Sequence, residues 1–253
     1  MHYPKYHDLG DKTVFITGGG SGIGASFVSA FAQQGAKVAF VSLSREPAEA
    51  LCDAVEKLAG HRPLYVRCDI RDIAALQAAM EKTRSELGPV RILINNAARD
   101  NRHEIEGFSV DEWDSSLNTN LRPHFFTVQA ALPDMKEHAG SIINVGSNSA
   151  ILGLAGYASY VTAKAGIVGL TKALARELGP FGIRANVLIP GWVLTERQKK
   201  LWATPEAIEE CLAQQSLKTT ITEEDVSNSA LFLASDASSM ITGQSLIIDG
   251  GRV

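Results

Sequence analysis

The sequence of 253 residues has no long apolar run, only three cysteines and no excess of basic residues. No stretch reaches the roughly 18 apolar residues that a transmembrane helix needs, so we expect no membrane partner. Lys and Arg number 24 against 28 Asp and Glu, a net charge of −4. That balance offers no broad phosphate-binding surface and argues against nucleic acid as a partner. The three cysteines (Cys52, Cys68 and Cys211) show no metal-ligand spacing, so no metal site is expected.

The sequence also carries no sign of a targeting segment or of a second domain. Its first eight residues lack the apolar core of a signal peptide. An odd number of cysteines favours reduced thiols, and together these features predict a cytoplasmic protein. Hydrophobic residues make up 45% and charged residues 21%, as in globular proteins. No repeat or Pro/Gly/Ser-rich linker divides the chain, so we expect one domain over residues 1–253.

Short apolar runs alternate with amphipathic stretches of helical length. The runs predict strands at 13–17, 38–41, 64–68, 92–95, 141–145, 185–189 and 246–248. The stretches predict helices at 22–34, 45–59, 72–87, 111–135, 157–179 and 223–235. Apolar strands separated by helices are typical of an α/β fold with a doubly wound parallel sheet flanked by helices. Residues 192–218, polar and helical in pattern, interrupt this alternation after the sixth strand, where such sheets bind ligands.

A glycine-rich turn joins the first strand to the first helix. Gly18, Gly22 and Gly24 have the spacing G-x-x-x-G-x-G, and no Gly-Lys-Ser/Thr follows, which excludes a P-loop. Glycine permits a positive φ and a close approach of the backbone, and a helix N-terminus offers free N–H groups to an anion. The turn therefore favours pyrophosphate binding, although a structural role for the glycines remains the alternative.

Residues at the ends of the next two strands bear on the choice of nucleotide. Ser42 stands where an acidic residue would bind the adenosine ribose and repel a 2′-phosphate. Arg45 lies just beyond it and has the chemistry to pair with such a phosphate, which favours NADP, unless it is only a solvated residue near a helix start. Asp69 follows the third strand and either accepts a hydrogen bond from adenine or caps the helix that begins near Asp72.

A possible reactive centre lies in the second half of the chain. Tyr160 and Lys164 are four residues apart and share one face of a helix. A nearby ammonium group lowers the pKa of a phenol, so we expect Tyr160 to act as a general base near neutral pH. Ser147, just past the fifth strand, either reaches the substrate or caps a turn. Asn120 lies within a predicted helix and either binds a water that leads to Lys164 or is a surface residue.

These motifs together resemble the short-chain dehydrogenase/reductase family from about residue 12 to residue 251. The resemblance rests on the glycine turn, Asn95-Asn96-Ala97, Asn120, Ser147 followed 13 residues later by Tyr160, Lys164 and Pro190-Gly191. It implies a Rossmann-type fold with a seven-stranded sheet, a nicotinamide cofactor and a homotetramer. It also implies the catalytic set Asn120, Ser147, Tyr160 and Lys164. The cofactor residues that it suggests, with those argued above, are Gly18, Ser21, Gly22, Ile23, Gly24, Ser42, Arg45, Asp69, Ile70, Asn96, Tyr160, Lys164, Pro190, Gly191 and Val193.

Substrate choice is expected to lie in the loop at 99–103 and in the 192–218 segment. Both are rich in hydrogen-bond donors, which suits a sugar better than a lipid. Trp192 and Trp202 are candidates to stack on a pyranose. The bacterial aldose (D-xylose-type) 1-dehydrogenases of the family are similar in three patterns: Asn101-Arg102-His103, Thr195-x-Arg197-Gln198 and Trp202-x-Thr204-Pro205-Glu206. This resemblance implies oxidation of a sugar at C1 to the lactone. The expected substrate-binding residues are Asn101, Arg102, His103, Ser147, Asn148, Tyr160, Trp192 and Arg197.

Two other functions remain open on the sequence alone. The same residues, used in reverse, would reduce 3-oxoacyl thioesters or other small carbonyl compounds. A nicotinamide-binding sensor without catalysis is a different class, although all four reactive positions are filled.

Overall fold

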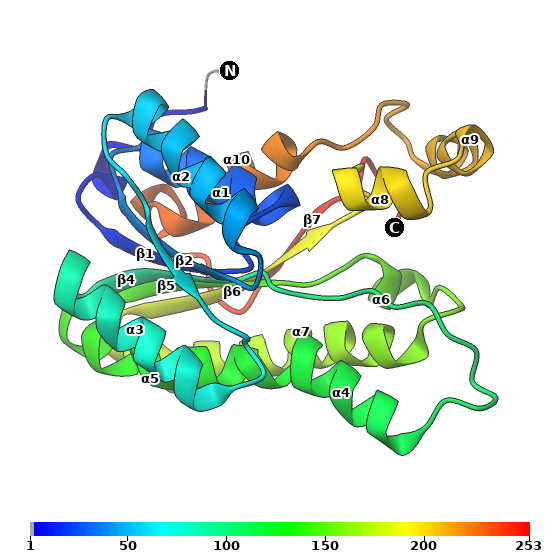
Figure 1. The fold of residues 1–253 in the computed structure, drawn as a ribbon, viewed down its shortest axis with the longest axis horizontal. Helices are drawn as coiled ribbons and strands as arrows, with labels where there is room; N and C mark the ends of the chain where they lie inside the picture. The colour runs from blue at the N-terminus through cyan, green and yellow to red at the C-terminus, as the bar shows by residue number, and fades with distance from the viewer. Residues whose placement is uncertain (1–2) are drawn as a thin grey trace.

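A computed structural model describes residues 3–253 as a parallel sheet between two layers of helices (Figure 1). The seven strands have the order β3-β2-β1-β4-β5-β6-β7, and every neighbouring pair is parallel. This confirms the predicted fold class. The strands are β1 (Thr13–Thr17), β2 (Lys37–Ser42), β3 (Leu64–Arg67), β4 (Val90–Asn95), β5 (Gly140–Val145), β6 (Ile183–Pro190) and β7 (Ser245–Ile248).

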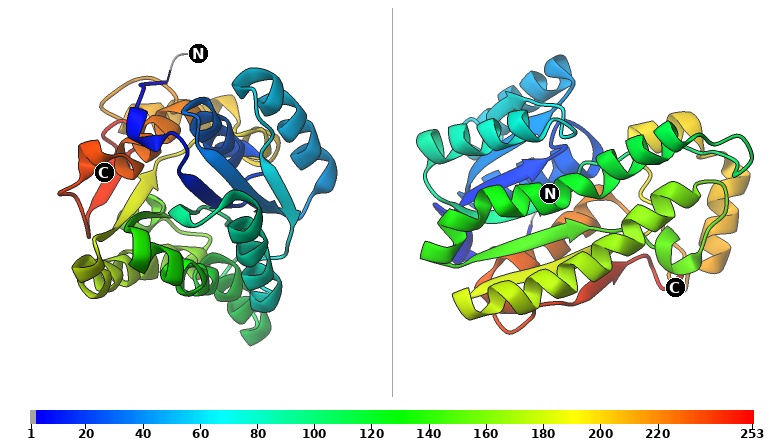
Figure 2. Two further views of the ribbon diagram at one scale, coloured as in Figure 1. Left: turned by 90° about the vertical axis from the view of Figure 1, so that its left-hand side faces the viewer. Right: turned by 90° about the horizontal axis from the view of Figure 1, so that it is seen from below.

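The sheet carries a separate apolar core on each face. Along β1, Val14 and Ile16 pack into one core and Phe15 into the other, so all three are fully buried. Burial on both faces explains why the strands read as continuous apolar runs. One face is covered by α1 (Gly22–Gln33), α2 (Arg45–Ala59) and α10 (Glu223–Ala234). The other is covered by α3 (Ile73–Leu87), α5 (Arg122–His138) and α7 (Ala158–Leu178), seen from below in Figure 2.

The predicted helix at 111–135 is wrong as a single element. The structure has two helices there, α4 (Val110–Asn120) and α5, separated at Leu121, whose φ of −129° is not helical. Pro123 lies in the first turn of α5. Proline has no N–H to continue a helix but suits the first turn of a new one, so the chain breaks just before it. The amino end of α4 is fixed by a capping box between Ser109 and Glu112.

Shorter elements gather beyond the carboxyl ends of the central strands. The 192–218 segment forms α8 (Glu196–Leu201) and α9 (Pro205–Gln214), a lobe that projects past the end of β6 (Figure 1). The four-residue helix α6 (Ser149–Leu152) follows β5, and single 3-10 turns lie at His7–Leu9, Gly179–Phe181 and Asp236–Ser238. Within residues 3–253, no helix is long and apolar enough to cross a membrane.

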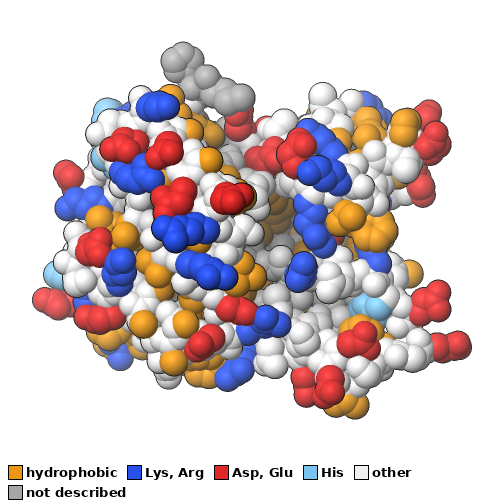
Figure 3. Space-filling view, in the orientation of Figure 1, with side chains coloured by type: hydrophobic (Ala, Val, Ile, Leu, Met, Phe, Trp, Pro, Cys, Tyr) orange, Lys and Arg blue, Asp and Glu red, His pale blue; other side chains and the backbone are white. Residues whose placement is uncertain are grey.

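The topology itself marks one edge of the sheet for ligand binding. β1 has β2 on one side and β4 on the other, so the direction of the crossovers reverses between them. In open parallel sheets, ligands bind in the crevice beyond the carboxyl ends of the strands at such a reversal. The space-filling view is hollowed between the half of the molecule that carries α2 and the lobe that carries α8 (Figure 3).

Candidate active site

The glycine turn has the close backbone packing that a bound pyrophosphate requires. Gly18 and Gly22 have φ values of +68° and +52°, in the left-handed region. A Cβ on Gly24 would lie 1.9 Å from the carbonyl oxygen of Gly18 and 2.7 Å from Nδ2 of Asn96. That same Nδ2 donates to the carbonyl oxygens of Thr17 and Gly18, at 3.1 and 3.2 Å. These contacts press the N-terminus of α1 against the turn, so the site fits a nucleotide diphosphate.

The hydroxyl of Thr17 holds the turn from the other side. Its Oγ1 accepts hydrogen bonds from the backbone N–H groups of Asn96 and Ala97, at 3.0 and 3.1 Å. Thr17 therefore joins the ends of β1 and β4 beside the glycine turn, a position for which the sequence reasoning assigned it no role. Its position directly before the first glycine was the available signal.

The residues that bear on the choice of nucleotide lie along the edge at β2 and β3. A Cβ on Gly20 would meet Oγ of Ser42 at 2.5 Å, so Ser42 lies directly beside the glycine turn. Arg45 is exposed, and its Nε is 4.0 Å from the carboxylate of Glu49, a pair that contributes little in water. Its guanidinium is therefore free to turn towards a phosphate.

Asp69 does not cap the helix that follows it. Asp72 is the N-cap of α3 and accepts from the N–H of Ala75, so that alternative for Asp69 is wrong. The carboxylate of Asp69 pairs instead with the guanidinium of Arg71 at 2.6 Å, which lowers the pKa of Asp69. It is ionised at neutral pH, with acceptor capacity left for an adenine amino group.

The remaining expected cofactor residues line the same edge. Ser21 is the N-cap residue of α1. The N–H of Gly191, directly after β6, donates to Ile248, and buried Val193 forms an isolated bridge with Ile221. A Cβ on Gly22 would lie 3.1 Å from Cγ2 of Thr195, so the 191–195 loop closes over the glycine turn. The other members, partly buried or at the end of a strand, are Ile23, Ile70 and Pro190.

Tyr160, Lys164 and Ser147 meet where α7 crosses the end of β5. Lys164 is 1% exposed, and its Nζ donates to the carbonyl oxygen of Val145 at 2.7 Å. The same Nζ lies 5.7 Å from the centre of the Tyr160 ring. Ser147 lies near enough to Tyr160 to lower the pKa of its phenol, and Oγ of Ser147 lies 2.7 Å from Oγ of Ser149. A phenol, a hydroxyl and an amine therefore converge at the carboxyl edge of the sheet, and Ser149 is a fourth polar group that the sequence reasoning missed.

The expected lowering of the Tyr160 pKa is not what this arrangement produces. Burial is the largest influence and raises the pKa of Tyr160, the carboxylate of Asp100 raises it further, and the hydrogen bond from Ser147 lowers it. Burial also lowers the pKa of Lys164 to about 7, because the charged ammonium is desolvated. A lysine that is largely neutral above that pH brings little positive charge to the phenol. The sequence argument assumed a charged lysine in water.

Asn120 is the last residue of α4 rather than a mid-helix residue. Its Oδ1 accepts from the N–H of Arg99 at 2.7 Å, and its Nδ2 donates to the carbonyl oxygen of Arg99 at 3.1 Å. The buried amide thus ties the break between α4 and α5 to the loop after β4. Its side chain is engaged with the backbone, so the proposal that it acts on a water rests on the family resemblance alone.

Several residues expected to bind substrate are held by other parts of the protein. Asn148 is 4% exposed, and its Nδ2 donates to Oδ2 of Asp249 at 3.3 Å, so its amide also holds the turn after β5 in place. His103 stacks on Phe108 with the ring centres 3.9 Å apart. Its backbone N–H donates to the carbonyl of Gly156. These two residues shape the rim of the site. Asn101 is exposed in the same loop.

The loop at 99–103 is joined to the α8 lobe by polar side chains. Nε2 of Gln198 donates to Oδ2 of Asp100 at 2.8 Å, and Oε1 of Gln198 accepts from Nε1 of Trp192 at 2.9 Å. Nε of Arg197 lies 3.6 Å from Oδ1 of Asp100. Trp192 and Arg197 were expected at the substrate, whereas Asp100 and Gln198 were not. Their link depends on two segments about a hundred residues apart and has no local sequence signal.

Arg102 lies against two aromatic rings in the same region. Its guanidinium carbon is 4.1 Å from the centre of the Tyr157 ring and 5.0 Å from that of Trp202. The Tyr157 ring in turn lies 5.6 Å from that of Tyr160. Cation–π contacts of this kind favour a fixed guanidinium. Trp202 therefore faces Arg102, and Tyr157, for which the sequence suggested no role, lies between this guanidinium and the Tyr160 ring.

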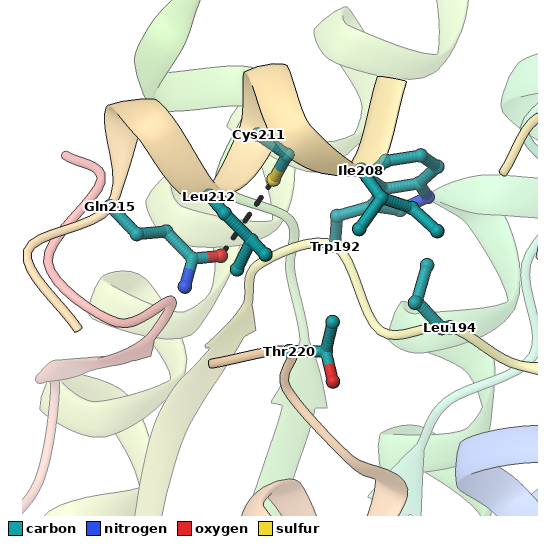
Figure 4. Close-up of a pocket in the computed structure, with 7 residues that line it drawn as sticks. All are labelled: Trp192, Leu194, Ile208, Cys211, Leu212, Gln215 and Thr220. Atoms are coloured by element: carbon teal, nitrogen blue, oxygen red, sulfur yellow. Dashed lines mark hydrogen bonds between the residues drawn. The ribbon is translucent and has the colours of Figure 1, made fainter. Parts of the chain in front are cut away.

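The α8 lobe is packed against the loop beneath it with little empty space. A cavity of about 10 Å³ remains there, close to the volume needed for one water. In Figure 4 the Cys211 thiol of α9 points to Gln215, the residue directly after this helix, and their Sγ–Oε1 distance is 3.7 Å. The lining residues are Trp192, Leu194, Ile208, Cys211, Leu212, Gln215 and Thr220. Among residues 3–253, no group of three His, Cys, Asp or Glu side chains is placed to hold a metal ion.

Comparison with known proteins places the chain in a family. Residues 18–252 match the family model described as "Enoyl-(Acyl carrier protein) reductase". Among solved structures, a Sinorhizobium meliloti protein described as a "putative short-chain alcohol dehydrogenase" is 31% identical, with a TM-score of 0.92 over 98% of both chains. A metagenomic blue fluorescent protein in complex with NADPH is 34% identical, with a TM-score of 0.89 over 97% of this chain and 99% of its own.

Curated relatives cover the whole length. The "Probable galactose dehydrogenase GalD" of Rhizobium meliloti is 47% identical over 98% of this chain and 97% of its own. The D-xylose 1-dehydrogenase of Caulobacter vibrioides is 46% identical over 97% of both. With the glycine turn and the Ser147, Tyr160 and Lys164 centre described above, these matches show that the chain is a nicotinamide-dependent oxidoreductase acting on CH–OH groups and belongs to the short-chain dehydrogenase/reductase family.

Proposed function

We propose that the protein oxidises an aldose sugar at C1 to the lactone. The observation that carries this proposal is the polar mouth above Tyr160, where Asp100, Gln198 and Arg102 offer both acceptors and donors. A sugar needs such groups matched to its hydroxyls, whereas a lipid pocket is mainly apolar. Two sugar dehydrogenases are 46–47% identical to this chain, whereas the 3-oxoacyl-[acyl-carrier-protein] reductases are 34–37% identical. The higher identity to the sugar dehydrogenases supports the same proposal.

The chain's own groups can carry the proton chemistry of that reaction. The phenolate of Tyr160 removes the proton of the C1 hydroxyl as a general base, and Ser147 donates to the same oxygen and holds it in place. Lys164, anchored to Val145, would hold the nicotinamide ribose. The nicotinamide supplies the acceptor for the C1 hydride. Because burial raises the pKa of Tyr160, we expect the oxidation rate to rise with pH through the alkaline range.

For the nucleotide, the edge at β2 supports NADP. Ser42 brings no negative charge beside Gly20, and Arg45, three residues further along the chain, is exposed and has a guanidinium that suits a 2′-phosphate. An acidic residue at position 42 would repel that phosphate.

We also propose that residues 1–253 act as one domain whose substrate choice lies in the 99–103 loop and the 192–218 segment. The hydrogen bond that Gln198 donates to Asp100 and the ion pair of Arg197 with Asp100 join the two segments and support this division. We further propose that the protein forms a homotetramer and is located in the cytoplasm. Light scattering tests the oligomeric state, and cell fractionation tests the location.

The experiment is a panel of aldoses and a 3-oxoacyl thioester, each assayed with NAD and with NADP in both directions. We expect reduction of the nicotinamide with an aldose and release of a lactone. Turnover of the thioester alone would favour the reductase, the alternative that the more distant relatives and the family description support. Tyr160→Phe should abolish turnover while the cofactor still binds. A Tyr160→Phe protein with full biological activity would instead indicate a sensor.

A further inference from the structure

We propose that Asp249 is a positioning residue that holds the turn of Ser147 and the end of α9 in one fixed arrangement. It acts through Asn148 on one side and through the 250–253 segment on the other. The inference rests on the part that the proposed function gives to Ser147, and it adds to that function a residue outside the reactive centre.

The carboxylate of Asp249 is buried and has all its acceptor positions in use. Asp249 directly follows β7 and is 4% exposed. Its Oδ1 accepts from the N–H groups of Gly251 and Arg252, at 2.9 and 3.1 Å. Its Oδ2 accepts from the N–H of Val253 at 3.0 Å and from Nδ2 of Asn148 at 3.3 Å. These donors match the roughly four positions that an ionised carboxylate offers, so they fix the orientation of the side chain.

Two glycines allow the backbone to fold around this carboxylate. Gly250 and Gly251 have φ values of +67° and +75°, in the left-handed region that other residues rarely adopt. The backbone then turns the consecutive N–H groups of residues 251–253 towards the same carboxylate. Successive N–H groups in such a turn form a concavity that binds an anion. The 250–253 segment is therefore held in place by Asp249.

The 250–253 segment in turn holds the end of α9. Two of its carbonyl oxygens accept from the N–H groups of Leu217 and Ser216, at 2.8 and 3.2 Å. The guanidinium of Arg252 donates twice to Oε1 of Gln214, the last residue of α9, at 2.9 and 2.7 Å. Asp249 is thus connected to the stretch at 192–218, in which we expect the substrate to be chosen (Figure 1).

On its other side, Asp249 holds the turn that carries Ser147. The backbone N–H of Asn148, the next residue, donates to the carbonyl oxygen of Pro190 at 3.1 Å, and its side chain donates to Asp249. A Cβ on Gly191 would lie 2.7 Å from Cβ of Asp249, so Asp249 also packs directly against the turn after β6. A displacement of about 1 Å at a reacting group can lower turnover about 100-fold. We therefore expect Asp249 to affect the rate by fixing the backbone beside Ser147.

The test begins with Asp249→Asn, which keeps the size of the side chain but replaces one acceptor by a donor. In either orientation the new amide nitrogen faces donors, either that of Asn148 or those of the 250–253 segment. With the aldose that the panel above identifies, kcat should fall about 10- to 100-fold. Adding Asn148→Asp sets an acceptor opposite the new donor and should return kcat to within about threefold of the wild type.

Arg252→Ala tests the connection to α9 separately. It removes only the bonds to Gln214, so KM for the sugar should rise about 2- to 10-fold, the effect of a lost hydrogen bond, with kcat unchanged. A merely structural role of Asp249 would not divide kcat from KM between these two variants.

Asp134→Asn is the matched control, because Asp134 is another buried carboxylate that accepts from a backbone N–H. It is 7% exposed and accepts from Val90, the first residue of β4, at the opposite edge of the sheet. This variant should have a lower Tm but the kcat and KM of the wild type. If Asp249→Asn behaves in the same way, Asp249 is only structural and the inference is overturned. The inference also fails if adding Asn148→Asp restores nothing.

Failure of the proposed function has a different result. If no aldose is oxidised, or if Ser147→Ala keeps the wild-type kcat, the proposed chemistry fails. Amide hydrogen exchange needs no substrate and still tests the arrangement. Exchange at Asn148, Ser216 and Leu217 should be at least about tenfold faster in Asp249→Asn and unchanged in Asp134→Asn. Wild-type exchange at these three amides in Asp249→Asn would refute the inference.

Discussion

Gly24→Ala tests the argument that the glycine turn is built by close packing. The added Cβ would lie 1.9 Å from the carbonyl oxygen of Gly18 and 2.7 Å from Nδ2 of Asn96. Relieving such an overlap costs about 1–3 kcal/mol. Displacing Asn96 also breaks its bonds to Thr17 and Gly18, at about 1 kcal/mol each. Alanine in a helix returns at most about 1 kcal/mol. We therefore expect a net loss of about 2–4 kcal/mol in the free energy of unfolding.

Chemical denaturation and cofactor titration together measure this effect. For a chain of this size, the loss corresponds to a fall of about 5–15 °C in Tm. Binding of either nucleotide should weaken more than tenfold, because α1 can no longer approach the turn. Gly169→Ala is the control, since nothing lies within 4 Å of a Cβ at that position in α7, and it should raise stability by about 0.5–1 kcal/mol. If Gly24→Ala is as stable as the wild type and binds the cofactor normally, the packing argument is refuted.

Three further substitutions probe other parts of the structure. Ser42→Asp should shift the ratio of kcat/KM for NADP over NAD at least tenfold towards NAD, and an unaltered ratio would remove the basis for the NADP proposal. His124 is buried and its pKa is lowered to about 3, so it is neutral in the folded protein and charged in the unfolded chain below about pH 6.5. Stability should therefore fall as the pH drops from about 6.5 towards 3, and His124→Gln should lose less over this range in urea titrations. The carboxylate of Asp134 accepts hydrogen bonds from Nε of Arg84 at 2.6 Å and from the N–H of Val90 at 2.9 Å. Asp134→Ala should therefore lower the free energy of unfolding by about 3–5 kcal/mol. A loss of less than about 1 kcal/mol, measured by chemical denaturation, would contradict this prediction.

Local chemistry explains why the fold was readable from the sequence. The central strands are buried on both faces and therefore appear as unbroken apolar runs, such as Ile92-Leu93-Ile94, and the glycine spacing marks the first turn. The break between α4 and α5 was missed because both halves keep the helical period, and only Leu121 and Pro123 depart from it. Pro123 would have predicted the boundary between the two helices, because proline favours the first turn of a helix.

The pKa values at the reactive centre are the property that the sequence predicted least well. The spacing of Tyr160 and Lys164 places both on one face of α7, but the sequence does not show how deeply that face is buried. In the folded protein, burial raises the pKa of the phenol and lowers that of the amine, and both shifts run against the simple ion-pair argument. The loop residue Asp100 adds a further opposing charge from a distant part of the chain. The acidity of Tyr160 is therefore set first by its burial and then by Asp100 and Ser147, which come from other parts of the chain, rather than by the lysine one turn away. A variant in the 99–103 loop should accordingly move the pH profile of oxidation, which the Tyr-x-x-x-Lys motif by itself gives no reason to expect.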